Sequence, residues 1–160
     1  MKRKNKINYK EIFFLVGFMI SLSGVAQKEN ENKDKYLDSL ANKIQFQYKK
    51  LIFREGTLEA MREIVEYLDE NEKYYVVESH TCMRNSSESN QELTDKRAQM
   101  MERLFVKIGL DSSKFVTVGY GQDKPCCNIG KTGLQRYKNR RVEIKEISEE
   151  ELIKLKRSKK

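Results

Sequence analysis

Side chains that bind metals or perform catalysis are scarce in this sequence. It has one histidine and three cysteines among 160 residues. A zinc site would have to combine His80 with Cys82, Cys126 and Cys127, and the last two are adjacent, which rarely suits one tetrahedral ion. A nucleophilic cysteine would need an activating base and an oxyanion site, and no other pattern indicates either. We therefore expect a protein without a metal, without a cofactor and without enzymatic activity.

Long apolar runs are also missing. The apolar run near the N-terminus, residues 12–22, has eleven residues, whereas a transmembrane helix needs about 20. Five basic residues precede this run, and the small residues Gly24 and Ala26 follow it, which is the pattern of a secretory signal peptide. We expect residues 1–26 to be removed. The alternative is an uncleaved inner-membrane anchor, which would be the only link to a membrane because no cysteine near Ala26 could carry a lipid.

A strong excess of one charge is absent as well. The formal net charge of +8 comes partly from the N-terminal segment, and elsewhere basic and acidic residues interleave on the predicted helices, which is typical of solvated surfaces. The charge pattern therefore does not favour nucleic acid as a partner. An exported chain reaches an oxidising compartment where cysteines can pair, and with three cysteines at least one is left over or pairs between molecules.

The sequence does contain alternating strand and helix patterns. Apolar residues alternate with polar ones at 44–48 and predict a strand. Helical spacing follows from Thr57, the expected N-cap, to residue 69, and again from Asn90 or Gln91 to residue 108. The remaining elements expected are strands at 74–78, 115–120 and 141–147, with a long loop at 121–138.

This order predicts an α+β two-layer sandwich with the succession βαβαβ, a loop and a last strand. Each helix is long enough to cross over between parallel strands, and right-handed crossovers place both helices on the same face. We expect a mixed four-stranded sheet with two main helices on one face, built from residues 43–148. A charged linker, residues 27–42, is expected before this domain, and a basic helical tail, residues 149–160, after it.

Five short motifs occur in order on these predicted elements. They are SHT at 79–81, Asn90, LTDKRA at 93–98, VGYGQDKP at 118–125 and NRRVEI at 139–144. Their order and spacing closely resemble the OmpA-like C-terminal domain family, over roughly residues 44–147. The resemblance implies a non-enzymatic protein that associates, without covalent chemistry, with the diaminopimelate of the peptidoglycan stem peptide.

The resemblance also implies which residues meet the ligand. The family's arginine that grips a ligand carboxylate corresponds to Arg97, and its strand-end threonine and loop asparagine correspond to Thr81 and Asn90. Arg140, in the last motif, either completes the basic pocket or supports the sheet. Cys82 stands where the family has an aspartate that pairs with the ligand's ammonium group. Independently of the family, arginine can hold a carboxylate through two parallel hydrogen bonds, and an expected position in the first turns of a helix favours an anion near Arg97.

A neutral thiol or a disulfide at Cys82 cannot supply the missing negative charge. Loss of one charged hydrogen bond costs about 1.5–3 kcal/mol, which is roughly 10- to 100-fold in affinity. Glu88, Asp95 and Asp123 are the carboxylates that could compensate for the exchange.

For Cys82, a disulfide is a better hypothesis than a metal site or a catalytic nucleophile. In the predicted topology Cys82 and the loop that carries Cys126 and Cys127 lie at the same end of the sheet, and either of the two could be the partner. The bond would close a loop of about 45 residues and contribute about 3–4 kcal/mol in the chain-entropy model.

Two functional classes follow from the sequence. The first is a periplasmic protein of a Gram-negative envelope, associated with the cell wall or outer membrane, that binds the peptidoglycan stem peptide. The second is an interaction subunit that has kept the fold, lost the ligand and binds other envelope proteins in a secretion or motility assembly. Cys82 favours the second class, and the retained Arg97 and Asn90 favour the first.

Overall fold

The structure is a computed structural model that describes residues 35–126 and 132–159. The predicted signal peptide, the first half of the predicted linker and Cys127 lie outside the described residues. Residues from Leu37 onward form one compact unit. Within the described ranges, no helix is long and apolar enough to cross a membrane.

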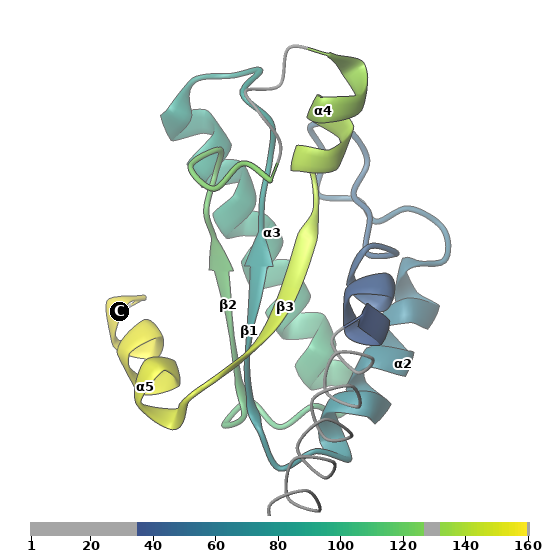
Figure 1. The fold of residues 1–160 in the computed structure, drawn as a ribbon, viewed down its shortest axis with the longest axis vertical. Coiled ribbons are helices and arrows are strands. Elements are labelled where there is room, and N and C mark those ends of the chain that lie inside the picture. The colour runs from purple at the N-terminus through teal and green to yellow at the C-terminus, as the bar shows by residue number, and fades with distance from the viewer. Residues whose placement is uncertain (1–34, 127–131, 160) are drawn as a thin grey trace, which may run out of the picture. The chain divides into compact units, whose positions relative to one another are not determined.

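Three strands form the central sheet (Figure 1). They are β1 (Tyr74–Ser79), β2 (Phe115–Gly119) and β3 (Val142–Ile147), in the order β2-β1-β3. β1 runs parallel to β2 and antiparallel to β3. The mixed sheet is as predicted, and the bounds of these three strands agree with the predicted ones to within one residue.

The predicted fourth strand at residues 44–48 is wrong, because this segment does not join the sheet. Phe46 makes only an isolated antiparallel bridge with Phe53. Between them the chain turns back through Lys49, whose φ is +58°, so its backbone hydrogen bonds are used within this hairpin. The alternating pattern predicted burial correctly at Ile44, which is buried, and at Phe46, which packs against the core. Tyr48, the third member of the pattern, is exposed.

Two long helices cover one face of the sheet (Figure 1). α2 spans Thr57–Asp69 and α3 spans Ser87–Ile108. Their apolar residues pack with those of β1 and β3 into the main core, to which a helix at 35–41 also contributes. The most deeply buried residues of this core are Leu40, Ile44, Met61, Ile64, Leu68, Val77, Met101 and Phe105. The two-layer arrangement of α2, α3 and the sheet is as predicted.

The N-terminus of α2 is built differently from the predicted one. Gly56 occupies the N-cap position and makes no side-chain capping bond. The Thr57 hydroxyl instead donates to the backbone carbonyls of Lys43 and Gln45, both at 3.3 Å. Thr57 therefore ties α2 to the segment before it, in place of the predicted capping role.

The start of α3 also differs from the predicted start at Asn90 or Gln91. The helix begins at Ser87, because the Ser86 hydroxyl accepts a hydrogen bond from the Ser89 amide. Arg97 is therefore the eleventh residue of the helix, about three turns from its start. Since the helix dipole acts within the first turn, its predicted contribution to anion binding at Arg97 is wrong.

A short helix, α4 (Gly133–Asn139), interrupts the loop predicted at residues 121–138. Thr132 and Gln135 form a capping box at its start, which satisfies backbone amides that the first turn leaves without partners. The prediction of a continuous loop is therefore wrong, and α4 places Arg140 at its own C-terminal end.

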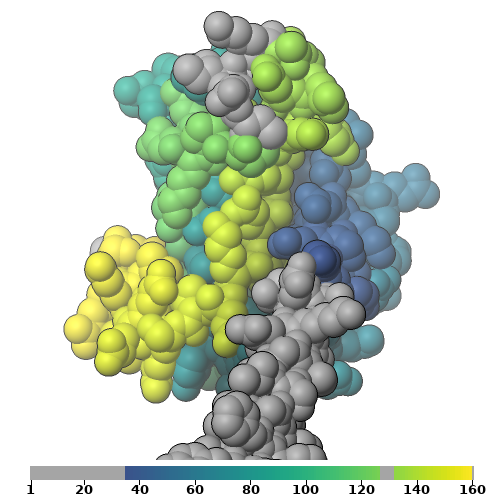
Figure 2. All heavy atoms as spheres, in the orientation of Figure 1, coloured from purple at the N-terminus to yellow at the C-terminus, as the bar shows by residue number. Residues whose placement is uncertain are grey.

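The expected C-terminal helix, α5 (Glu149–Ser158), packs on the face of the sheet opposite to α2 and α3. Leu152 of α5 contacts Val76 and Val116 in a second, smaller apolar cluster. Figure 2 shows this face, on which β3 is exposed between α5 and the residues that follow position 35.

Two glycines of the VGYG motif let the end of β2 approach α3. A Cβ on Gly119 would lie 2.6 Å from the backbone nitrogen of Asp95, and Gly121 has a φ of +51°. The Gly121 carbonyl accepts from the Thr81 amide at 2.8 Å, and the Gly121 amide donates to the Thr94 hydroxyl at 2.9 Å. The motif thereby holds the end of β1 against α3.

Candidate functional site

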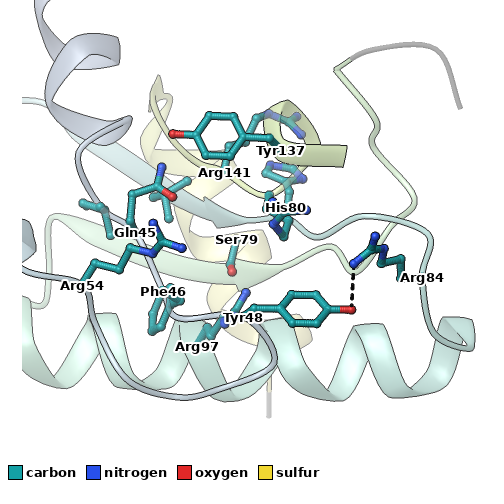
Figure 3. A pocket seen from close by; sticks show the side chains of 13 residues that line it. Gln45, Phe46, Tyr48, Arg54, Ser79, His80, Arg84, Arg97, Tyr137 and Arg141 are labelled. Atoms are coloured by element: carbon teal, nitrogen blue, oxygen red, sulfur yellow. Dashed lines mark hydrogen bonds between the residues drawn. The ribbon is translucent and has the colours of Figure 1, made fainter. Parts of the chain in front are cut away.

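A pocket of about 160 Å³ opens between the 44–54 segment, the end of β1, α3, α4 and the start of β3 (Figure 3). Polar and aromatic residues that line it include Tyr48, Arg54, Arg84, Arg97, Tyr137 and Arg140. Pockets that enclose a whole small molecule measure about 300–1,000 Å³. This pocket therefore suits the end of a larger ligand.

Arg97 reaches the pocket from α3 and is only 4% exposed. Its Nη2 donates to the carbonyls of Gln47 and Lys50, both at 3.1 Å, and its guanidinium lies 4.6 Å from the centre of the Phe46 ring. Its Nε is buried without a hydrogen-bond partner among the described residues. Burial, and then the positive charge of Arg140, lower the pKa of Arg97 to about 10. Arg97 is thus a buried cation whose Nε and Nη1 make no hydrogen bond within the described ranges.

Cys82 and Arg140 meet beside Arg97. Nη1 of Arg140 donates to Sγ of Cys82 at 3.7 Å and to the Arg136 carbonyl at 2.9 Å. Thr81, Cys82, Arg97 and Arg140 together line a slit of about 10 Å³ next to the main pocket, which has room for about one water molecule. The structure therefore brings four of the five predicted site residues together, around a nearly closed space.

Asn90, the fifth predicted residue, is fully buried and does not line the pocket or the slit. Its Nδ2 donates to Oε1 of Gln122 at 2.7 Å, and to the carbonyls of Cys82 and Asn85 at 3.3 Å. These bonds hold the loop that carries Cys82 against α3. A direct contact between Asn90 and a ligand stays a prediction.

Acidic side chains line neither the pocket nor the slit in the part of the chain that the structure describes. Glu88 lies in the first turn of α3. Asp95 accepts a hydrogen bond from Nε2 of Gln91 at 2.9 Å, and Asp123 lies in the turn after β2, where its amide donates to the Tyr120 carbonyl. The three carboxylates named as substitutes for the missing charge are therefore placed elsewhere.

The predicted disulfide is not formed between Cys82 and Cys126. Cys82 is a buried free thiol, and the Cys126 amide donates to Oδ1 of Asn139 at 3.0 Å. Cys127, the alternative partner, lies outside the described residues, so that pairing stays a prediction.

A second polar cluster lies on the face of the sheet that carries α5. Glu78, His80 and Glu143 place ligand-type atoms within 4.8 Å of one another, so they are the group among the described residues that could hold a metal ion. The ammonium of Lys145 already bridges the two carboxylates, at 2.7 Å from Glu78 and 2.6 Å from Glu143. Lys124 lies 3.2 Å from Glu78. The cluster is thus an ion network in which Lys124 and Lys145 neutralise the carboxylates of Glu78 and Glu143.

Sequence reasoning missed the residues that frame the pocket. Tyr137 comes from α4, which was predicted as loop. Tyr48 comes from the segment predicted as a strand, and Arg54 from the residues after it, for which no element was predicted. A capping signal at Thr132 and Gln135 could have revealed α4. Nothing in the alternating pattern at 44–48 indicated that the chain would turn back there.

Comparison with known proteins supplies the family. A model described as the OmpA family matches residues 45–140, more than half of the chain. The chain is 24% identical over 139 residues to the sodium-type flagellar protein MotY of Vibrio parahaemolyticus, which covers 78% of this chain and 46% of MotY. It is 34% identical over 70 residues to the peptidoglycan-associated lipoprotein of Pseudomonas aeruginosa, which covers 44% of this chain and 41% of the lipoprotein. The chain spans less than half the length of either relative.

A solved structure shows the same fold. The peptidoglycan-associated lipoprotein from Burkholderia pseudomallei superposes with a TM-score of 0.59 at 21% identity, and the match covers 65% of this chain and 88% of that one. Identity at this level supports the fold alone, whereas the family model spans the hairpin, α2, β1, α3, β2 and α4. The chain belongs to the OmpA family.

Proposed function

We propose that this protein associates with peptidoglycan without covalent chemistry, as a non-enzymatic periplasmic component of a Gram-negative envelope. The observation that carries the proposal is the buried guanidinium of Arg97, which lines a pocket and has hydrogen-bond donors left over. Membership of the OmpA family and the similarity to a protein named for its association with peptidoglycan support it.

The proposed ligand group is a carboxylate of diaminopimelate in the stem peptide. Nη2 of Arg97 already bonds two backbone carbonyls, so Nη1 and the buried Nε are left for a ligand. Arg140 lies close enough to lower the pKa of Arg97 and supplies a second cation. We expect the carboxylate to lie between these two arginines, since hydrogen bonds between ionised groups are about twice as strong as neutral ones. Thr81 and Cys82 form the closed side of the site.

Co-sedimentation with purified peptidoglycan sacculi tests this function. The key variant is Arg97→Lys, which keeps the charge but loses the planar set of donors. Arg103, exposed on the same helix, gives the matched control Arg103→Lys. We expect the wild type and Arg103→Lys to sediment alike and Arg97→Lys to bind at least about 10-fold more weakly. A wild type that stays in the supernatant, or an Arg97→Lys variant that binds equally well, would contradict the proposal.

A second candidate function is that of an interaction subunit in an envelope assembly. It is favoured by the nearly closed slit beside Cys82 and by the similarity to a flagellar protein over 78% of the chain. Affinity purification from envelope extracts, with the partner identified by mass spectrometry, separates the two functions. This second function would be supported by a partner that binds the wild type and Arg97→Lys equally, when neither protein binds to sacculi.

A further inference from the structure

We propose that the pocket selects oxyanions without a neighbouring positive charge, and that its ligand is a stem-peptide carboxylate whose adjacent amine has been acylated. The identity of the ligand rests on the proposed function, whereas the selectivity rests on the charges around the pocket. A free diaminopimelate end carries an ammonium beside its carboxylate. When the amine is acylated, as in a cross-link between two stems, it becomes a neutral amide and the end is a net anion.

Positive charge meets the pocket from four separate parts of the chain. Arg54 comes from the hairpin before α2, Arg84 from the loop after β1, Arg97 from α3 and Arg140 from the end of α4. Aspartate and glutamate are absent from the lining within the described ranges. A ligand that enters this pocket therefore meets cations and no built-in anion.

The polar contacts of the two inner arginines are with neutral groups. Arg97 bonds two carbonyls, and Arg140 bonds one carbonyl and the sulfur of Cys82. Arg141, which also lines the pocket, differs because its Nε donates to Oε1 of Glu143 at 2.6 Å. Arg97 and Arg140 thus form an unneutralised pair of like charges, and after burial it is the charge of Arg140 that lowers the pKa of Arg97.

A ligand with a carboxylate and no ammonium supplies the negative charge that neutralises Arg97 and Arg140. Its carboxylate gains charge-assisted hydrogen bonds in a partly desolvated site, where they are stronger than in water. An ammonium carried beside the same carboxylate would lose hydration and meet guanidinium groups in place of an acceptor. The zwitterion should therefore bind about 10- to 100-fold more weakly than the acylated form, the range of one charged hydrogen bond.

A phosphate group shares the oxyanion chemistry and could come from a different molecule. The lining favours the peptide source, because Phe46, Tyr48 and Tyr137 offer aromatic surface to the chain beside the carboxylate. Inorganic phosphate is therefore included as a probe that distinguishes the two sources.

Isothermal titration calorimetry with two synthetic stem peptides tests the proposal. The peptides both contain diaminopimelate and differ only in whether its free amine is acetylated. We expect the acetylated peptide to bind the wild-type protein at least about 10-fold more tightly. Equal affinity, or tighter binding of the peptide with the free amine, would overturn the proposal.

Two substitutions at Cys82 test whether the selectivity between the two peptides arises in this pocket. Cys82→Asp introduces a carboxylate beside Arg140, so we expect it to reverse the preference towards the free amine, whereas the neutral Cys82→Ser should keep the wild-type preference. An aspartate variant that folds and still prefers the acetylated peptide would place the selectivity elsewhere and overturn the assignment to this pocket. If the aspartate variant fails to fold, the two peptides with the wild-type protein still decide the question.

The experiments distinguish a failure of this inference from a failure of the proposed function. Binding to sacculi without a preference between the peptides overturns this inference and leaves the proposed function intact. Binding of inorganic phosphate, without binding of either peptide or of sacculi, supports the selectivity for oxyanions but overturns the peptide ligand and the proposed function.

Discussion

The sulfur of Cys82 accepts a hydrogen bond from Nη1 of Arg140, with 3.7 Å between nitrogen and sulfur. A thiol is a weak acceptor, so this contact leaves the guanidinium charge of Arg140 available to a ligand. A carboxylate at position 82 would instead form an ion pair with Arg140 and compete with any anion that enters the pocket. The thiol therefore fills the space beside Arg140 and leaves the site positively charged.

Cys82 should resist alkylation while the protein is folded, because its side chain is buried. Its thiol is free, so alkylation after unfolding should need no reduction. Iodoacetamide should modify Cys82 only after denaturation, and without any need for a reductant. Peptide mass mapping of native and denatured samples measures this. If Cys82 in denatured protein became reactive only after reduction, it would be part of a disulfide, and the pairing predicted with Cys127 would be the explanation.

Arg97 should matter for stability as well as for binding, because its Nη2 holds the turn that contains Gln47 and Lys50. Hydrogen bonds from a charged donor contribute about 1.5–3 kcal/mol. We expect Arg97→Ala to lower the free energy of unfolding by about 2–4 kcal/mol, measured by urea denaturation. The exposed control Arg103→Ala should change it by about 0.5 kcal/mol or less. Equal stability of the two variants would show that the turn does not depend on Arg97.

Apolar patterning predicted the three strands that join the sheet. β1, β2 and β3 were placed to within one residue because their runs of apolar and β-branched residues are buried by the helices. The segment at 44–48 has a similar pattern, but alternation predicts only that one side of the segment faces the core. Which backbone it pairs with depends on the turn at Lys49, and no glycine, proline or asparagine marks that turn.

Some residues of the candidate site could likewise be predicted from the sequence, and others could not. The grouping of Thr81, Cys82, Arg97 and Arg140 followed from motifs that have a fixed place on the fold, and the structure brings these residues together. Tyr48 and Tyr137 could not be placed because they lie on segments whose path is decided by local hydrogen bonds, in the hairpin and in α4.

Gly119 should tolerate no side chain, because a Cβ there would lie 2.6 Å from the backbone nitrogen of Asp95. The end of β2 or α3 would have to move, and forced packing of this kind costs about 1–3 kcal/mol. We expect Gly119→Ala to lower the thermal midpoint clearly, measured by circular dichroism. Gly133→Ala is the matched control, since a Cβ at Gly133 would meet no atom within 4 Å. A Gly119→Ala protein that melts like the control would contradict the close approach of β2 and α3.

The ion network around Glu78 should make stability depend on pH in the acid range. Burial raises the pKa of the Glu78 carboxyl, but His80, Lys145 and Lys124 outweigh burial and hold that pKa well below its ordinary value of 4.5. A carboxyl with a lowered pKa in the folded state stabilises the protein above about pH 4.5 and loses this effect as the pH falls further. We therefore expect the free energy of unfolding to fall below about pH 4.5, measured by urea denaturation between neutral and acid pH.

Glu78→Gln isolates this contribution, because the amide keeps the shape of the side chain and cannot ionise. We expect the variant to be less stable than the wild type by about 1–3 kcal/mol at neutral pH, since it leaves buried polar groups poorly paired. The difference should shrink as the pH falls, because the wild-type carboxylate then becomes protonated and resembles the amide. Glu66→Gln, at an exposed position of α2, should leave both the stability and its pH dependence unchanged. A Glu78→Gln protein with the same acid profile as the wild type would mean that other carboxylates govern acid unfolding.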